Sequence, residues 1–142
     1  MNGLLADANI LGQLGRLLSA LRSAEWAPFW EDLTIPVVGF DALGLAHDAP
    51  DRVVWNACQR AGFILLTANR NNDGPDSLDA AIRDGPATSL PVLTIADAAR
   101  VMHDGIYALQ VAIDLLDYLT DLRDVPDKLL GAGRLYLPKQ PL

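Results

Sequence analysis

The sequence predicts an α/β protein built around a central, mainly parallel β-sheet of four to five strands. Short apolar segments of strand-like composition alternate along the chain with stretches in which apolar residues recur every three or four positions. Polar or turn-forming residues follow each short segment, as expected where a strand passes into a loop. Because strands that alternate with helices are joined by right-handed crossovers, we expect the strands to run parallel.

Composition indicates one globular domain. The chain has 142 residues, of which 51% are hydrophobic and 20% are charged, and this length is enough to bury a core without disulfides or metals. The apolar stretches are too short to span a bilayer. The first residues lack the basic start and the cleavage pattern of a signal peptide. We therefore expect a cytoplasmic protein with no membrane association.

The net charge of −7, with two lysines in the whole chain, argues against a general polyanion binder, because nucleic-acid affinity comes largely from Lys and Arg. A carboxylate cluster that binds a divalent metal would give the same acidic excess. His47 and His103 are too far apart in the sequence for a zinc motif. The single cysteine, Cys58, falls on the apolar face of a helical pattern, which favours a structural role.

The first half of the chain shows an apolar run that ends at Asp7, and Asn9 is suited to cap the helix that follows. Pro36 limits the next strand to a sheet edge or a strand start. The expected elements, in order, are a strand at 3–7, a helix at 10–24, an aromatic turn at 26–30, a strand at 34–39 and a loop at 41–50.

The middle of the chain repeats the pattern. A helix begins near Asp51 and Gly62 is placed to end it, since glycine readily adopts the left-handed conformation of a helix stop. The expected elements that follow are a strand at 63–67, a short helix at 77–83, a strand at 90–95 and a helix at 96–102.

The last part of the chain differs in character. A long helix is predicted with an apolar stripe formed by Ile106, Leu109, Ile113, Leu116 and Leu119. A second face carries three acids, expected to be solvated: Asp114, Asp117 and Asp121. The stripe needs a surface to cover, either on its own domain or on a second copy, and we predict a homodimer. The tail at 131–138 is either a short strand or an ordered strap.

Oxygen-bearing side chains gather near the expected ends of two strands. They are Asp7 after the first strand, Asp51 at the start of the helix before the third, Asn69 and Asn71 just past the third, and Asp73 and Asp76 in the next loop. If both strands belong to one parallel sheet, their polar ends meet. Oxygen ligands of this kind suit Mg²⁺ or Mn²⁺, which can activate a water for attack on a phosphodiester.

Each candidate has a simpler interpretation. Asp51 and Asp76 each precede a helical pattern and are suited to act as N-caps. Arg70 fits either a phosphate contact or an ordinary salt bridge. Asp7 is the hardest to dismiss, because a charge between apolar neighbours at a strand end is costly unless it is paired or bound to metal.

Three segments together resemble a known family. The chain is similar to the PIN-like proteins of the DUF5615 type, close to the VapC toxin nucleases. The similarity lies in the run 4–9, in Asp51, which stands sixteen residues before Thr67, and in the segment 65–71. The resemblance covers about residues 3–102. It implies a three-layer α/β/α sandwich, a PIN-like domain at 1–104 and a C-terminal helix and tail at 105–142. It also implies a metal-dependent endoribonuclease centre.

Within the resemblance, Asp7 matches the family's first acid and Asp51 its helix-start acid. Asn69 and Asn71 stand where relatives commonly have Asp, and Asn9 stands at a position that is often Glu-rich. An amide still offers a carbonyl oxygen to Mg²⁺ but brings no negative charge, so these differences should weaken metal binding.

Two functions follow as hypotheses. The first is a ribonuclease that uses Mg²⁺ or Mn²⁺. Its expected catalytic residues are Asp7, Asp51 and Asp73, its metal ligands Asp7, Asp51, Asp73 and Asp76, and its substrate-binding residues Asn9, Asn69, Arg70 and Asn71. The second is a PIN-like module that has lost catalysis and binds a protein or RNA partner. An antitoxin-like protein is a further expected partner, as in toxin–antitoxin pairs.

Overall fold

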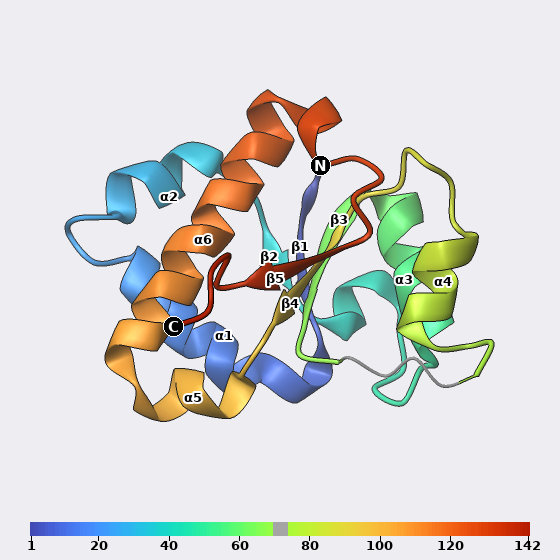
Figure 1. The fold of residues 1–142 in the computed structure, drawn as a ribbon, viewed down its shortest axis with the longest axis horizontal. Coiled ribbons are helices and arrows are strands. Elements are labelled where there is room, and N and C mark those ends of the chain that lie inside the picture. The colour runs from blue at the N-terminus through green and yellow to red at the C-terminus, as the bar shows by residue number, and fades with distance from the viewer. Residues whose placement is uncertain (70–73) are drawn as a thin grey trace.

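The protein folds around one parallel sheet. The computed structural model describes residues 1–69 and 74–142 (Figure 1). Within these residues five strands pair in the order β2-β1-β3-β4-β5, and every neighbouring pair is parallel. The strands are β1 (Gly3–Ala6), β2 (Val37–Val38), β3 (Phe63–Thr67), β4 (Val92–Ile95) and β5 (Arg134–Leu137). The predicted α/β class with a mainly parallel sheet is confirmed.

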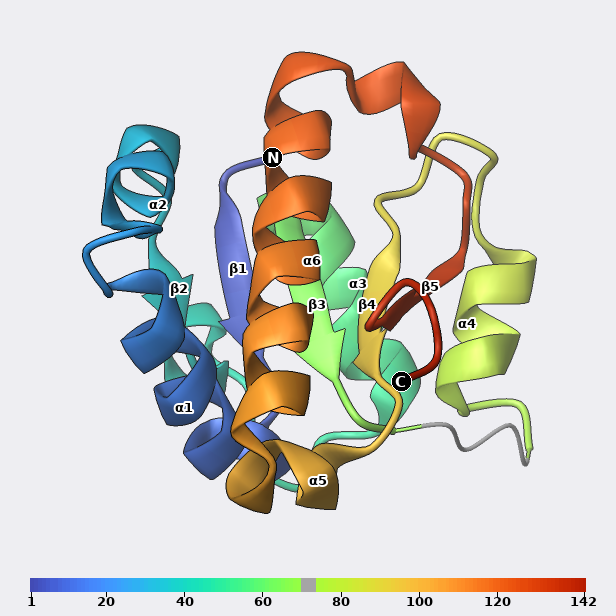
Figure 2. The ribbon, with the colours of Figure 1, turned by 60° about the vertical axis from the view of Figure 1, so that its left-hand side comes forward.

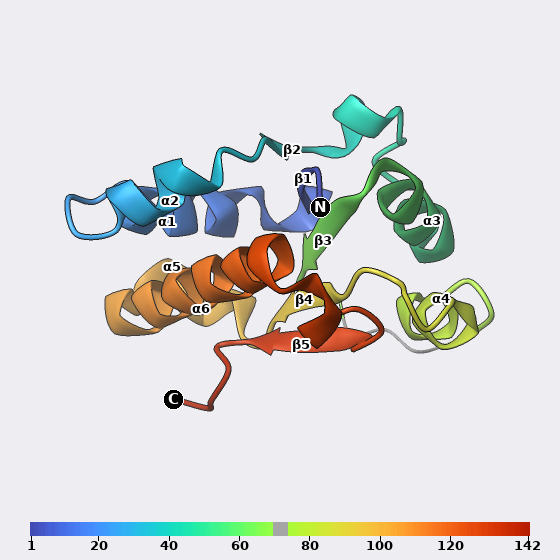
Figure 3. The same cartoon turned by 90° about the horizontal axis from the view of Figure 1, so that it is seen from above.

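Helices cover both faces of the sheet and give three layers, α/β/α. They are α1 (Leu11–Leu21), α2 (Ala27–Leu33), α3 (Asp51–Ala61), α4 (Leu78–Asp84), α5 (Ala98–His103) and α6 (Gly105–Asp124), with short 3-10 turns η1 (Ala8–Ile10), η2 (Phe40–Leu43) and η3 (Pro126–Lys128). Seen from above, α3 and α4 lie on one side of the sheet and the other four α-helices on the opposite side (Figure 3).

The three central strands, β1, β3 and β4, are largely buried on both faces, and alternate side chains enter different cores. Leu4 and Ile64 belong to the larger core, formed with α1, α5 and α6, whereas Leu5 and Leu65 belong to the core beneath α3 and α4. This alternation follows from the two-residue period of a strand. It explains why the strands read as continuous apolar runs.

Gly62 ends α3, as the sequence predicts. Its φ is 74°, and its N–H donates to the carbonyl oxygens of Cys58 and Gln59. A side chain there would be strained by the positive φ, and its Cβ would meet the Asn2 amide at 2.6 Å. Since β3 begins at the next residue, this stop fixes where β3 starts. Cys58 is buried within α3, as expected.

The first half departs from the sequence prediction in three places. Asp7, not Asn9, caps the first helical turn, because its carboxylate accepts the N–H of Asn9. The expected aromatic turn is the helix α2, whose start accommodates Pro28 because an N–H is not needed in a first turn. The strand expected at 34–39 pairs at Val37–Val38.

Residues 105–142 join the same core and the same sheet. Figure 2 shows α6 crossing the face of the sheet that α1 also covers, and buried residues of α6 belong to the larger core. The tail forms β5, which pairs in parallel with β4. Of the two alternatives for the tail, the strand is therefore the one found. None of the helices within the described ranges is long and apolar enough to cross a membrane.

The burial of α6 corrects two predictions. Leu116 and Leu119 of the expected stripe are buried, but Ile106 is 81% exposed. The face of the helix that is buried is rotated away from the expected stripe. Asp114 was expected in solvent and is buried. Its carboxylate accepts hydrogen bonds from the Gln110 side chain at 2.9 Å and from the Lys139 N–H at 2.7 Å.

Candidate metal centre

The register of the sheet brings the ends of β1 and β3 together. Leu5 pairs with Leu65 and Ala6 with Leu66, and the N–H of Asp7 donates to the Leu66 carbonyl at 2.9 Å. Asp7 is therefore the first residue beyond β1 and lies beside Thr67, the last residue of β3. Both stand at the carboxyl edge of the sheet, where parallel α/β folds place their ligands.

The Asp7 carboxylate is held by two neighbours. Its Oδ2 accepts from the Thr67 hydroxyl at 2.7 Å, and its Oδ1 accepts from the Asn9 N–H at 3.3 Å. Thr67 is 1% exposed, so its hydroxyl is a fixed donor. Hydrogen bonds from two neighbours hold the carboxylate in one orientation.

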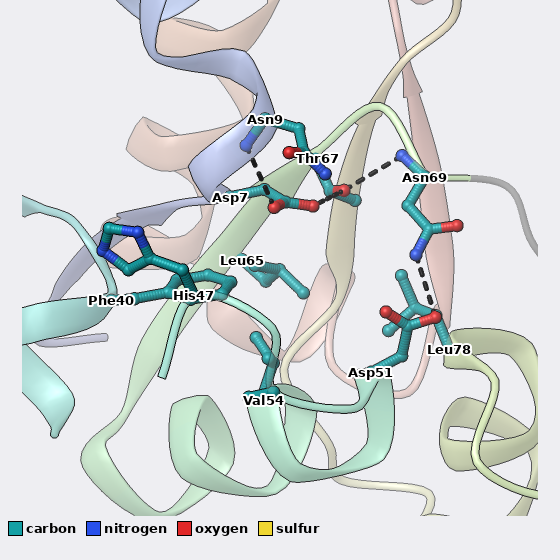
Figure 4. A pocket seen from close by; sticks show the side chains of 11 residues that line it. Asp7, Asn9, Phe40, His47, Asp51, Val54, Leu65, Thr67, Asn69 and Leu78 are labelled. Carbon is teal, nitrogen blue, oxygen red and sulfur yellow. Dashed lines mark hydrogen bonds between the residues drawn. The ribbon is translucent and has the colours of Figure 1, made fainter. Parts of the chain in front are cut away.

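Asn69 links Thr67 to Asp51. The Asn69 N–H donates to the Thr67 hydroxyl oxygen at 3.0 Å, and the Asn69 side-chain amide donates to Asp51 Oδ2 at 2.9 Å. Figure 4 shows these contacts running from Asp7 through Thr67 and Asn69 to Asp51. One chain of hydrogen bonds thus connects the ends of β1 and β3 with the start of α3.

Asp51 is not the N-cap of α3, so the cap interpretation of Asp51 is wrong. Pro50 occupies the N-cap position of α3, and Asp51 is the first helical residue. The cap interpretation of Asp76 is wrong as well, since the Ser77 hydroxyl accepts the Ala80 N–H and caps α4. An acid in the first turn of a helix is favoured by the helix dipole.

These side chains line one pocket of about 120 Å³. Its polar wall contains both acids and the side chains that bond to them, and its apolar wall comes from the core beneath α3 and α4. The lining residues are Asp7, Asn9, Phe40, His47, Ala49, Asp51, Val54, Leu65, Thr67, Asn69 and Leu78. Two carboxylates and an apolar wall thus line one small acidic pocket.

The remaining predicted site residues are distributed differently. Asp76 is exposed and lies in a neighbouring pocket that also contains Asp51. Its main-chain oxygen accepts the Arg52 N–H at 3.1 Å. Arg70, Asn71 and Asp73 lie outside the described residues. The structure therefore brings together Asp7, Asn9, Asp51 and Asn69, and it separates Asp76 from the pocket that contains Asp7.

The number of carboxylates in the pocket is at the low end of what a magnesium-like ion uses. Among residues 1–69 and 74–142, no three His, Cys, Asp or Glu side chains cluster closely enough to hold a metal. Mg²⁺, however, is commonly held by one or two carboxylates together with waters and substrate phosphates. Asp7 and Asp51 supply two carboxylates to the same pocket, which Asn9 and Asn69 also line.

Sequence reasoning missed two features of the pocket. Thr67 marks the end of a strand in the sequence, but nothing in the pattern indicates that its hydroxyl bonds to Asp7. His47 lines the pocket from an exposed loop, with Nε2 at 3.5 Å from Asp41 Oδ1. The loop pattern around His47 gives no signal that it folds over the sheet edge.

Comparisons of the chain with protein-family models, with curated proteins and with solved structures find no match. The fold and the pocket thus define the chain as a three-layer α/β/α protein with an acidic site at the carboxyl edge of its sheet.

Proposed function

We propose that this protein is a PIN-like, metal-dependent endoribonuclease that uses Mg²⁺ or Mn²⁺. The observation that carries the proposal is that Asp7 and Asp51, from different elements, line one pocket at the carboxyl edge of the parallel sheet. That edge is where α/β enzymes carry their chemistry. RNA as the substrate comes from the resemblance of the sequence segments to PIN-like nucleases, and a toxin-like role is part of the same proposal.

In this proposal Asp7 and Asp51 would hold the ion within the pocket that both of them line. A bound divalent ion would supply a water activated for in-line attack and positive charge beside the phosphodiester. Thr67 keeps the Asp7 carboxylate in one orientation, and Asn69 does the same for Asp51. Asn9 and Asn69, which line the same pocket, would contact substrate oxygens beside the ion. The proposed roles of Arg70, Asn71, Asp73 and Asp76 as site residues stay predictions.

A second candidate is a PIN-like module without catalysis that binds a protein or RNA partner. The observation that favours it is the state of the two acids: each already accepts a hydrogen bond from a neighbouring side chain. Asn69 also offers an amide at a position where relatives commonly carry a charge.

Calorimetric titration with Mn²⁺ separates the two candidates. The nuclease predicts millimolar or tighter binding that is lost in Asp7→Asn and in Asp51→Asn, because each change removes a charged ligand. Asp32→Asn is a matched control, since Asp32 lies on α2 and pairs with Arg123. Absence of heat with the unchanged protein would favour the module.

Cleavage of a labelled RNA by the same proteins tests the activity. The unchanged protein and Asp32→Asn should cleave with Mn²⁺ and lose activity with a chelator, whereas Asp7→Asn should be inactive although folded. Cleavage by Asp7→Asn at the unchanged rate would overturn the mechanism. A homodimer and an antitoxin-like partner stay predictions, and light scattering tests the first, because a mass of 15.3 kDa would contradict it.

A further inference from the structure

Asn69 also forms a hydrogen bond with β5, the last strand. Arg134, the first residue of β5, donates from Nη1 to the Asn69 carbonyl at 2.6 Å and to the Thr94 hydroxyl at 2.8 Å. Arg134 and Asn69 are 65 positions apart in the sequence. β5 therefore contacts Asn69, which lines the acidic pocket.

Arg134 is built into the fold rather than lying on its surface. Its side chain is 9% exposed, and a buried guanidinium needs a counter-charge and full hydrogen bonding. Asp79 on α4 supplies the charge, since its Oδ1 accepts from Nε at 3.1 Å and from Nη2 at 2.6 Å. Every nitrogen of the guanidinium thus has an acceptor, which fixes its orientation.

These contacts leave Asn69 with three anchors. Its N–H is bound to Thr67, its carbonyl oxygen to Arg134 and its side-chain amide to Asp51. With both main-chain groups held, the direction of the Cα–Cβ bond is set, and the side-chain amide starts from a fixed position. Loss of the Arg134 contact removes the hydrogen bond that the Asn69 carbonyl accepts, and we expect the direction of the side-chain amide toward Asp51 to change with it.

We propose that Arg134 is a positioning residue for the acidic pocket: through the Asn69 main chain it directs the Asn69 amide onto Asp51. The effect on metal binding rests on the proposed function, whereas the effect on Asn69 does not. Lysine cannot replace Arg134, because a single ammonium cannot serve Asp79, Thr94 and Asn69 in the planar arrangement of a guanidinium.

The experiment follows the Asn69 side-chain amide by NMR in the unchanged protein, Arg134→Met, Arg134→Lys and Arg123→Met. Arg123 is a matched control, because it is ion-paired to Asp32 and Asp124 away from the pocket. Both Arg134 variants should shift the Asn69 amide signals and speed their exchange with water. Arg123→Met should leave them unchanged. Unshifted signals in a folded Arg134→Met protein would overturn the proposal.

Arg134→Met leaves Asp79 without its partner and risks unfolding, so the double variant Arg134→Met, Asp79→Leu is made in parallel. It removes both charges and keeps the apolar volume, which cores tolerate better than one unpaired charge. The double variant should show the same Asn69 shift with the native fold. Native Asn69 signals in this folded variant would also overturn the proposal.

Mn²⁺ titration of the same proteins connects the position of Asn69 to the metal site. Residues that orient metal ligands typically contribute tenfold or more to affinity, so both Arg134 variants should bind Mn²⁺ about tenfold more weakly, with Arg123→Met unaffected. Shifted Asn69 signals with unchanged Mn²⁺ affinity would overturn the link to the metal site. If the unchanged protein binds no Mn²⁺, the proposed function fails, and a shift of the Asn69 signals still supports the positioning role.

Discussion

The hydroxyl of Thr67 donates to Asp7 Oδ2 across 2.7 Å and joins the ends of β3 and β1 at the carboxyl edge of the sheet. The same hydroxyl oxygen accepts the Asn69 N–H at 3.0 Å. Thr67 thus orders two parts of the pocket at once. Because it is 1% exposed, water cannot readily replace it in either bond.

Thr67→Val should lower the free energy of unfolding and weaken Mn²⁺ binding. The substitution keeps the shape but removes the hydrogen bond that Asp7 Oδ2 accepts and the one that the Asn69 N–H donates, and the loss of such bonds costs about 1–3 kcal/mol where the groups are shielded from water. Urea denaturation measures the first effect and calorimetry the second. Thr67→Ser retains the hydroxyl and should stay close to the unchanged protein. Equal stability of the Val and Ser variants would contradict the role given to this hydroxyl.

Asn69→Asp should have opposite effects on stability and on metal affinity. Without metal it replaces a donor to Asp51 by a like charge, so the free energy of unfolding should fall by about 1–3 kcal/mol. With Mn²⁺ it adds a charged ligand, and affinity should rise about tenfold, because ligand charge is a main determinant of affinity for hard cations.

The control for Asn69→Asp is Asn2→Asp, which also loses one amide hydrogen bond, to the Ala61 carbonyl. Asn2 precedes β1 and so lies at the opposite edge of the sheet from Asp7. Its variant should bind Mn²⁺ like the unchanged protein. If Asn69→Asp gives no gain of Mn²⁺ affinity, the residue at position 69 does not face the ion. An equal gain in Asn2→Asp would show that the added charge acts without regard to its position, which would also contradict the prediction.

Stability should fall at high pH because of Cys58. Burial raises the pKa of its thiol from about 9 to about 12. Above pH 9 the unfolded chain loses the thiol proton while the folded protein keeps it, so the unfolded state is favoured by about 1.4 kcal/mol per pH unit until about pH 12. Below pH 9 the thiol is protonated in both states and contributes nothing to the pH dependence.

The difference in free energy of unfolding between the unchanged protein and Cys58→Ala isolates this thiol, because every other titrating group is shared. The difference should be constant below pH 9 and should shift steadily in favour of the Ala variant above it. Parallel pH profiles of the two proteins would show that Cys58 reaches solvent in the folded state.

The arrangement of Asp7, Asp51 and Asn69 was open to prediction from sequence for a simple reason. Apolar runs separated by helices imply a parallel sheet, and the ends of neighbouring parallel strands must meet at one edge. The pattern fixes which residues follow each strand, and the sheet order then places them together. The direction of each side chain was not open to prediction in this way, because it depends on hydrogen bonds to residues far away in the sequence.

Asp114 and Arg134 show where that dependence matters. The helical period places Asp114 with Asp117 and Asp121, yet Asp114 is buried because the tail returns and donates the Lys139 N–H to it. Arg134 lies in a tail whose sequence fits both a strand and a strap. The error at Asp114 and the open choice for the tail both arise from the C-terminal segment, whose packing on α6 and β4 leaves no local sequence pattern.

The claim that Asp7 and Asp51 hold one divalent ion is tested most directly by a crystal soaked in Mn²⁺ and measured at the manganese absorption edge. The account predicts one anomalous peak in contact with an oxygen of Asp7 and an oxygen of Asp51, and its loss in crystals of Asp7→Asn. A saturated soak with no peak in this pocket, or with a peak that touches neither acid, would contradict it.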